Sequence, residues 1–153
     1  MGHGGQLICF SCGYSFDVML GIGMMQCGAF EVPKEKDDGT FDHRLRKCIP
    51  NRAEYNLVRD LLLQKHGVAL AYGYGLYRCS KCGKFKNLFH YRIKHDGGIY
   101  EPDYECKRCS VKLDYLGDEA ETEEGSSHID VAQFPCPKCG KQPLMLGGGI
   151  MWD

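Results

Sequence analysis

Residues 79–109 read CSKCGKFKNLFHYRIKHDGGIYEPDYECKRC, and their order of cysteines, strand-forming residues and turn residues predicts the centre of the fold. It begins and ends with a Cys-x-x-Cys pair. Between the pairs, aromatic and β-branched residues at 88–93 and 99–105 flank Asp96-Gly97-Gly98, which is typical of a hairpin turn. We call the turn formed by each Cys-x-x-Cys pair a knuckle. The order of knuckle, strand, turn, strand and knuckle predicts a zinc ribbon.

The Cys-x-x-Cys spacing occurs four times in the 153 residues, which hold ten cysteines. Two such turns that face each other supply four thiolates, the tetrahedral ligand set of one zinc ion. Eight paired cysteines therefore predict two zinc ions per chain. The inner ribbon, residues 77–111, uses Cys79, Cys82, Cys106 and Cys109, and the terminal knuckles, in residues 7–24 and 134–152, use Cys9, Cys12, Cys136 and Cys139.

A second pairing of the knuckles stays open. Cys106/Cys109 could join Cys136/Cys139, with residues 111–116 and 128–134 as strands. Cys9/Cys12 would then have to reach Cys79/Cys82 across 66 residues, which is the costlier loop closure. The nested pairing is favoured, because an apolar run broken by glycines follows both terminal knuckles.

The knuckles predict a structural role rather than catalysis. Glycine follows the second cysteine at positions 13, 83 and 140, where a positive backbone angle is useful, and Ser110 takes that place in the third knuckle. A closed four-thiolate site keeps no open coordination position. Thiol redox catalysis needs one such pair at a strand-to-helix junction, whereas these pairs end or begin strands. We therefore expect that the protein is not an enzyme.

Two cysteines, Cys27 and Cys48, stand outside the pattern. Each could be a buried apolar residue, a surface thiol or a substitute ligand. Their spacing matches no metal-ligand motif, and we expect burial.

One helix is expected at about residues 52–66. Asn51 can cap it with Glu54 three residues on, apolar residues recur at helical spacing, and Gly67 stands where a helix would end. Residues 68–77 predict a strand. Two segments are predicted as loops, Glu31–Arg44 and a flexible acidic loop at 117–128. The fold class is therefore small α+β, mainly antiparallel β, with residues 1–153 as one compact, metal-stabilised domain.

Composition limits the class of protein. The chain is 43% hydrophobic, and no apolar run reaches the roughly 18–20 residues of a membrane span. We expect a soluble cytoplasmic protein, since a reducing compartment keeps thiols free for metal. The formal charge of −1 becomes about −5 with eight thiolates and two zinc ions, which weighs against nonspecific DNA binding.

Two functions agree with these features. The first is a non-catalytic adaptor that holds an unidentified protein partner on a ribbon face or on its Gly-rich terminal segments. The alternative is a nucleic-acid-binding zinc ribbon that uses the basic and aromatic stretch 78–94. The aromatic residues of this stretch could instead pack in the core, which would argue against nucleic-acid binding. Its phosphate contacts would be Arg78, Lys81, Lys84, Lys86, Arg92 and Lys94, and its stacking residues Phe85, Phe89 and Tyr91.

Three short segments carry a family resemblance. They are Cys9-Phe10-Ser11-Cys12-Gly13-Tyr14, Leu20-Gly21-Ile22-Gly23 and Cys136-Pro137-Lys138-Cys139-Gly140. In these segments the chain resembles the small uncharacterised zinc-ribbon proteins of bacteria, with multiple Cys-x-x-Cys-Gly knuckles. They cover under half of the chain. The resemblance implies zinc binding and a ribbon fold, and it implies no particular activity.

Overall fold

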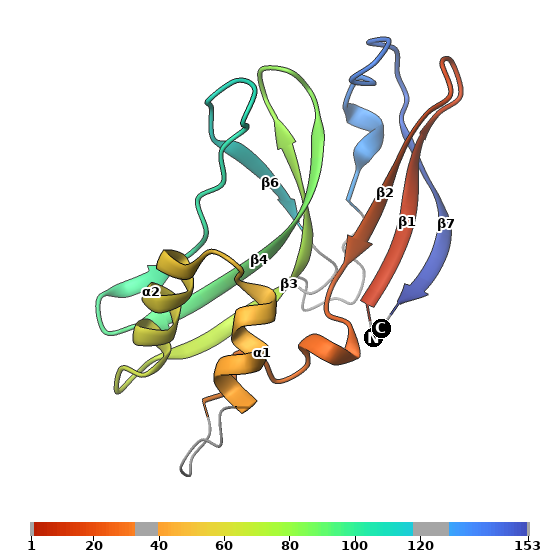
Figure 1. The fold of residues 1–153 in the computed structure, drawn as a ribbon. Coiled ribbons are helices and arrows are strands. Elements are labelled where there is room, and N and C mark those ends of the chain that lie inside the picture. Colours follow the sequence, from red (N-terminus) through yellow and green to blue (C-terminus); the bar gives the residue numbers. More distant parts are fainter. Residues whose placement is uncertain (1, 33–39, 118–128, 153) are drawn as a thin grey trace.

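The chain folds into two antiparallel sheets that stand side by side, with two helices on the larger sheet (Figure 1). The computed structural model describes residues 2–32, 40–117 and 129–152. This arrangement confirms the predicted fold class, small α+β and mainly antiparallel β.

The smaller sheet brings both ends of the chain together. Its strands are β1 (Gly2–Cys9), β2 (Tyr14–Leu20) and β7 (Met145–Trp152), in the order β2-β1-β7. Leu7 of β1 lies opposite Phe16 on one side and Leu146 on the other. The two segments that follow the terminal knuckles in sequence therefore occupy equivalent places beside β1.

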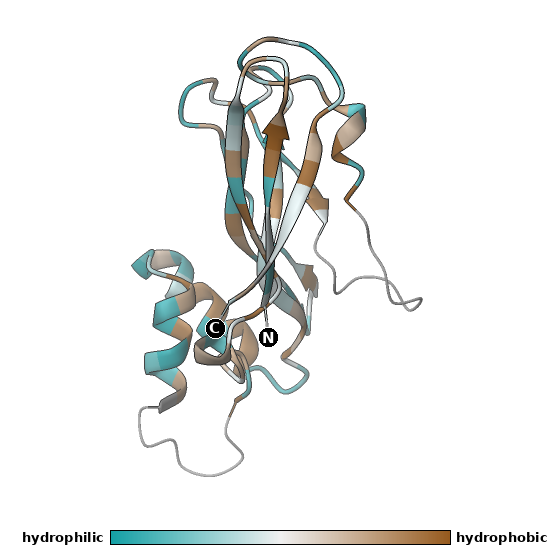
Figure 2. Cartoon of the chain, turned by 90° about the vertical axis from the view of Figure 1, so that its right-hand side faces the viewer, coloured by the Kyte–Doolittle hydropathy of each residue, from teal (hydrophilic) through white to brown (hydrophobic). Residues whose placement is uncertain are grey.

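The larger sheet has the order β5-β4-β3-β6. It consists of β3 (Val68–Cys79), β4 (Phe85–His95), β5 (Gly98–Tyr100) and β6 (Leu113–Gly117), and the long β3–β4 hairpin is its centre. Hydrophobic and hydrophilic residues alternate along the strands (Figure 2). On β4 the alternation buries Phe85, Phe89, Tyr91 and Ile93, whereas Lys86 and Lys94 are exposed.

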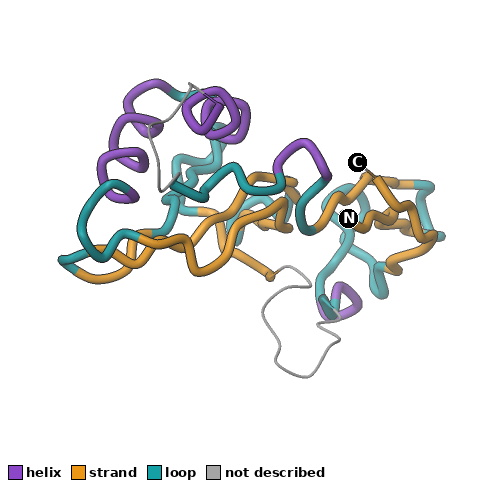
Figure 3. Tube along the Cα trace, turned by 90° about the horizontal axis from the view of Figure 1, so that it is seen from below, coloured by secondary structure: helices purple, strands orange, loops and turns teal. Residues whose placement is uncertain are grey.

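The helices cover one face of the larger sheet, as the view from below shows (Figure 3). The expected helix is α2 (Arg52–Leu62), which ends four residues before the expected end at 66. Its cap is Asn51, whose Oδ1 accepts the backbone N–H groups of Ala53 and Glu54 at 3.0 and 3.1 Å.

The predicted loop Glu31–Arg44 is wrong in part, because helix α1 (Thr40–Cys48) begins inside it. Phe41, Leu45 and Cys48 recur at helical spacing along α1, and all three are buried in the core between the helices and the larger sheet. Residues 33–39 of this prediction lie outside the described residues, as do residues 118–128 of the predicted acidic loop.

One side chain of β4 fastens the two sheets to each other. The Asn87 side chain accepts the Met19 N–H at 2.7 Å and donates to the Met19 carbonyl at 2.7 Å and the Gly75 carbonyl at 2.9 Å. Next to it, Gly21, which directly follows β2, forms a two-hydrogen-bond bridge with Tyr74 of β3. The apolar core between the sheets lies beside this junction and draws on residues of both.

Candidate metal centres

Four cysteines from the two ends of the chain meet above the smaller sheet; we call this group the terminal centre. The Sγ atoms of Cys9 and Cys139 lie 3.7 Å apart, and those of Cys12 and Cys136 also lie 3.7 Å apart. All four sulfurs fall within 4.8 Å of one another. Zinc–sulfur bonds of about 2.3 Å in a tetrahedron require sulfurs about 3.8 Å apart, so the group has the dimensions of a metal site.

A second group, the inner centre, lies at the same end of the larger sheet. It consists of Cys79, Cys82, Cys106 and Cys109, whose sulfurs also fall within 4.8 Å of one another. The Cys82 and Cys106 sulfurs are 3.9 Å apart. Each of the two groups therefore could bind one metal ion in a four-sulfur site.

The structure thus adopts the nested grouping of the knuckles. Cys106/Cys109 face Cys79/Cys82, and Cys136/Cys139 face Cys9/Cys12. The rival pairing is not formed, because β6 pairs with β3 instead of forming a ribbon with the last knuckle. The alternative pairing also required a strand at residues 128–134, but residues 131–133 form a short 3-10 helix.

All four knuckles share one backbone design. The residue after the second cysteine donates its N–H to the carbonyl of the first cysteine, at 2.8–2.9 Å in every case. That residue has a positive φ each time, near +70° at Gly13, Gly83 and Gly140 and +52° at Ser110. Glycine adopts this conformation without the steric cost that a side chain adds. The third knuckle therefore keeps the turn at some backbone cost.

Backbone amides in the turns favour the thiolate form that a metal needs. The Arg108 N–H lowers the pKa of the Cys106 thiol to about 7, and the Lys84 N–H holds the pKa of Cys82 below its usual value. Burial instead raises the pKa of Cys109 to about 12. A bound cation would offset that desolvation and let all four sulfurs ionise together.

The two centres are neighbours. A Cβ atom placed on Gly83 of the inner centre would lie 3.9 Å from the Pro137 Cα of the terminal centre. Arg78 spans the same junction, because its guanidinium lies 4.8 Å from the centroid of the Phe134 ring. We call the surface formed by the four turns, residues 9–14, 79–84, 106–111 and 136–141, the knuckle end; its hairpin tips stand at the top of Figure 1.

The basic residues of the predicted stretch 78–94 separate into different surroundings. Lys81 and Lys84 are exposed on the knuckle end, and Lys86 and Lys94 are exposed along β4. Arg92 forms an ion pair with Glu101 at 2.7 Å. The stretch therefore does not form one continuous basic surface with its aromatic residues, and Arg78 is engaged in the stack on Phe134.

The three aromatic residues proposed for stacking are in the core. Phe85, Phe89 and Tyr91 are 3%, 6% and 1% exposed. Tyr91 also donates a hydrogen bond to the Glu54 carboxylate on α2. Their rings offer no exposed face to a nucleic-acid base, because the strand alternation turns them towards the helices and the second sheet.

The nucleic-acid contacts predicted from the sequence left out four cations of the knuckle end. Lys107, Arg108, Lys138 and Lys141 are exposed there beside Lys81 and Lys84. The signal was present, since each lies in or directly after a knuckle. Only the grouping of both centres at one end of the molecule makes them a single surface.

The two unpaired cysteines differ. Cys48 is buried among the residues between the helices and the sheet, and burial raises the pKa of its thiol to about 11. Cys27 is exposed. Neither joins a metal-ligand group among the residues that the structure describes.

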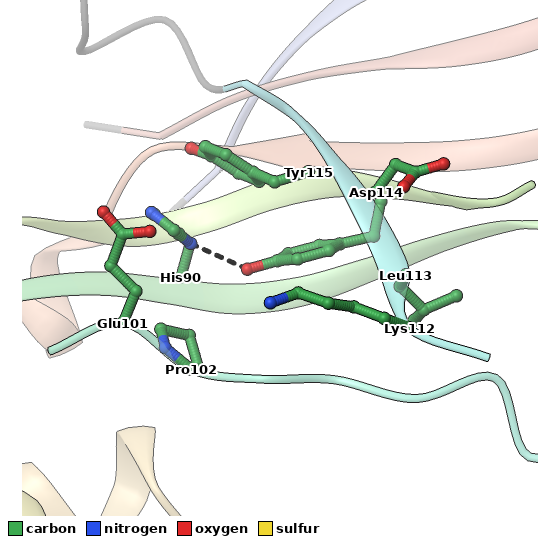
Figure 4. Close-up of a pocket in the computed structure, with 8 residues that line it drawn as sticks. His90, Glu101, Pro102, Lys112, Leu113, Asp114 and Tyr115 are labelled. Carbon is green, nitrogen blue, oxygen red and sulfur yellow. Dashed lines mark hydrogen bonds between the residues drawn. The ribbon is translucent and has the colours of Figure 1, made fainter. Parts of the chain in front are cut away.

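A cavity of about 330 Å³ lies on the face of the larger sheet opposite the helices (Figure 4). Its floor is the buried His90, whose ring stacks on Tyr115 at 3.8 Å between centroids and whose Nδ1 bonds the Tyr77 hydroxyl at 2.7 Å. Tyr115 also covers Gly75, where an added Cβ would lie 2.6 Å from its ring. These contacts hold β6, and with it the third knuckle, against β3 and β4.

Comparisons with known proteins give one partial similarity. The chain is 28% identical over 94 residues to the CRISPR-associated endodeoxyribonuclease Cas12f1 of an uncultured archaeon. The aligned part covers 60% of this chain and 17% of that protein. No protein family matches the chain. No solved structure matches it.

The described helices also bear on the expected absence of a membrane segment. Within the part of the chain that the structure describes, no helix combines the length and the apolar character needed to cross a membrane.

Proposed function

We propose that this protein is a zinc-stabilised, non-catalytic module that binds nucleic acid through its knuckle end. The observation that carries the proposal is the charge of that surface. The knuckle end holds six exposed lysines and arginines and no carboxylate. The six are Lys81, Lys84, Lys107, Arg108, Lys138 and Lys141.

The metal centres do not cancel this charge. A zinc ion with four thiolates carries about −2, so two centres offset four of the six cations and leave the surface basic. The chain as a whole is acidic once the centres are counted, because the formal charge of −1 becomes about −5 with eight thiolates and two zinc ions. A basic patch on an otherwise acidic protein gives local phosphate contacts without general attraction to polyanions.

Zinc is the metal that we propose for both centres. Four thiolates at tetrahedral spacing suit zinc and also iron, and we propose zinc because it has no redox chemistry and is the usual metal of structural four-cysteine sites. Four sulfur ligands close the coordination shell, which supports a structural rather than a hydrolytic role for the metal.

The partial similarity to Cas12f1 supports nucleic acid as the ligand and makes DNA the first probe. The aligned part spans only 17% of that endodeoxyribonuclease. The similarity therefore supports the proposal that this chain corresponds to one module of such a protein, and it does not support a cleavage activity. We therefore propose binding without cleavage.

Salt-dependent binding of labelled DNA tests the proposal. In fluorescence anisotropy, the metal-loaded protein should bind an oligonucleotide at low salt and lose affinity between about 50 and 200 mM salt. The double variant Lys81→Glu with Lys138→Glu alters both centres and should reduce the slope of log affinity against log salt by about 2.

The matched control reverses two exposed lysines beside the helices, Lys47→Glu with Lys65→Glu. It has the same change in net charge and should bind almost as the unmodified protein does. No binding at low salt, or equal losses in both variants, would overturn the proposal.

A protein adaptor is the second candidate function, and the edge strand β7 favours it. Among the strands that the structure describes, β7 has a neighbour on one side only, which is β1. Its Met145 and Met151 side chains are 50% and 65% exposed. An unpaired strand edge with apolar side chains can accept a strand from a partner.

The adaptor is tested by capture from extract of the source cells. Met145→Glu with Met151→Glu should abolish capture of a specific partner, whereas Met25→Glu, an equally exposed methionine outside β7, should not. Capture that is unchanged by the β7 substitutions would reject this surface.

A further inference from the structure

We propose that the knuckle end selects single-stranded nucleic acid and that Phe10 is the residue on which an unpaired base stacks. This inference rests on the proposed nucleic-acid binding. It assigns a role to a side chain that neither the metal centres nor the apolar cores use.

The Phe10 side chain is the one aromatic side chain that is exposed among the residues that the structure describes. Phe10 is 76% exposed. Among the described residues, every other phenylalanine, tyrosine and tryptophan is buried or half-buried. Its neighbours Cys9 and Cys12 belong to the core between the sheets, whereas Phe10 does not. Packing therefore gives no reason for an aromatic residue at this position.

The turn holds the ring on a fixed backbone. Phe10 lies between two cysteines of the terminal centre, and the Gly13 N–H closes the turn by donating to the Cys9 carbonyl at 2.9 Å. At the base of the turn Cys9 pairs with Tyr14 in the strand ladder. Stacking on such a ring orders little further backbone, which reduces the entropy cost of binding.

A lysine of the facing knuckle contacts the same turn that carries Phe10. Lys138 of the facing knuckle reaches across the terminal centre and donates to the Cys12 carbonyl at 3.4 Å. The turns of the other three knuckles each contain lysine or arginine, whereas the first contains Phe10 and Ser11. The four turns together thus present one ring among several cations.

This combination fits a single strand better than a duplex. An unpaired base can lie on an aromatic side chain while its flanking phosphates contact lysines. In a duplex the base faces are already stacked, so the ring can reach none of them without unstacking the helix. Phosphate contacts alone would remain for the duplex.

Affinities for a single strand and for the matching duplex test the inference. Phe10→Ala should weaken single-strand binding about tenfold, which is the cost of one stacked base, and should change duplex binding less than about twofold. Its salt dependence should not change, because no charge is lost. DNA and RNA strands of the same sequence show which sugar is preferred.

Phe10→Trp provides a second readout. It should retain single-strand affinity, and the new indole fluorescence should be quenched when a base stacks on it. The unmodified protein, whose single tryptophan is Trp152, supplies the background signal. Met25→Ala removes an exposed apolar side chain away from the knuckle end and should leave both affinities unchanged.

The outcomes separate this inference from the proposed function. If Phe10→Ala binds both strands normally or weakens both equally, while Lys81→Glu with Lys138→Glu weakens both, the stacking role is wrong and nucleic-acid binding stands. If the unmodified protein binds neither strand at low salt, the proposed function itself is wrong. Unchanged zinc content of Phe10→Ala excludes unfolding as the cause of any loss.

Discussion

The two metal centres use the same turn, but they join very different parts of the chain. In the inner centre the facing residues Cys82 and Cys106 are 24 positions apart in the sequence. The cysteines of this centre pack against residues of the larger sheet. In the terminal centre the facing sulfurs of Cys12 and Cys136 are 124 positions apart. The inner centre therefore stabilises a local ribbon, whereas the terminal centre closes the whole chain and places β7 beside β1.

The largest effect is expected from removing one ligand of each centre. Cys136→Ser and Cys106→Ser should each lose one metal ion and more than about 4 kcal/mol of unfolding free energy. Cys136→Ser should cost roughly 1 kcal/mol more, because its centre closes the longer loop. Elemental analysis and urea denaturation measure both quantities.

The control for these variants is Cys27→Ser, at the exposed cysteine outside both centres. It should change the unfolding free energy by less than about 0.5 kcal/mol. If Cys106→Ser destabilised the protein more than Cys136→Ser, the distinction between a local centre and a chain-closing centre would not hold.

A smaller effect is expected where the two sheets meet. Asn87→Ala removes three hydrogen bonds between β4 and its neighbours and leaves the Met19 amide without its partner. The unfolding free energy should fall by about 2 kcal/mol. Separate unfolding transitions for the two sheets would show that Asn87 couples them, and a loss as small as that of Asn56→Ala on exposed α2 would show that it does not.

The smallest effect compares the turns of the two centres. Gly140 in the terminal centre and Ser110 in the inner centre both have positive φ, and an added Cβ on Gly140 would meet no atom within 4 Å. Gly140→Ala should therefore cost about 1 kcal/mol from backbone strain alone. Ser110→Gly should gain about 0.5 kcal/mol. Changes of the same sign in both variants, measured by thermal unfolding, would contradict this account of the turn.

Much of the fold followed from local sequence signals. The hairpin around Asp96-Gly97-Gly98, the capped helix after Asn51 and the strand from Val68 are all short-range patterns, and each is present. The second strand of the hairpin is shorter than predicted, because β5 ends at Tyr100 instead of residue 105. Helix α1 was missed because six of its nine residues are polar or charged, although Phe41, Leu45 and Cys48 carry the helical spacing. In α1, the packing of these three buried side chains outweighs the low intrinsic helix propensity of the segment.

The candidate site could be predicted only in part. The spacing of the cysteines gave the ligands, and the loop lengths favoured the nested grouping that the structure adopts. The surface around them depends on three-dimensional proximity. Nothing local places Lys138 beside Cys12, or the second knuckle beside the fourth, because these contacts follow from how two sheets pack.

Metal content combined with thiol counting tests whether each four-cysteine group holds one zinc ion. We predict two zinc ions per chain, one readily reactive thiol in the native protein from Cys27, slow reaction of the buried Cys48, and all ten thiols after denaturation in chelator. A single zinc ion, bound iron, or rapid reaction of all the thiols in the native protein would show that the two groups are not a pair of zinc sites.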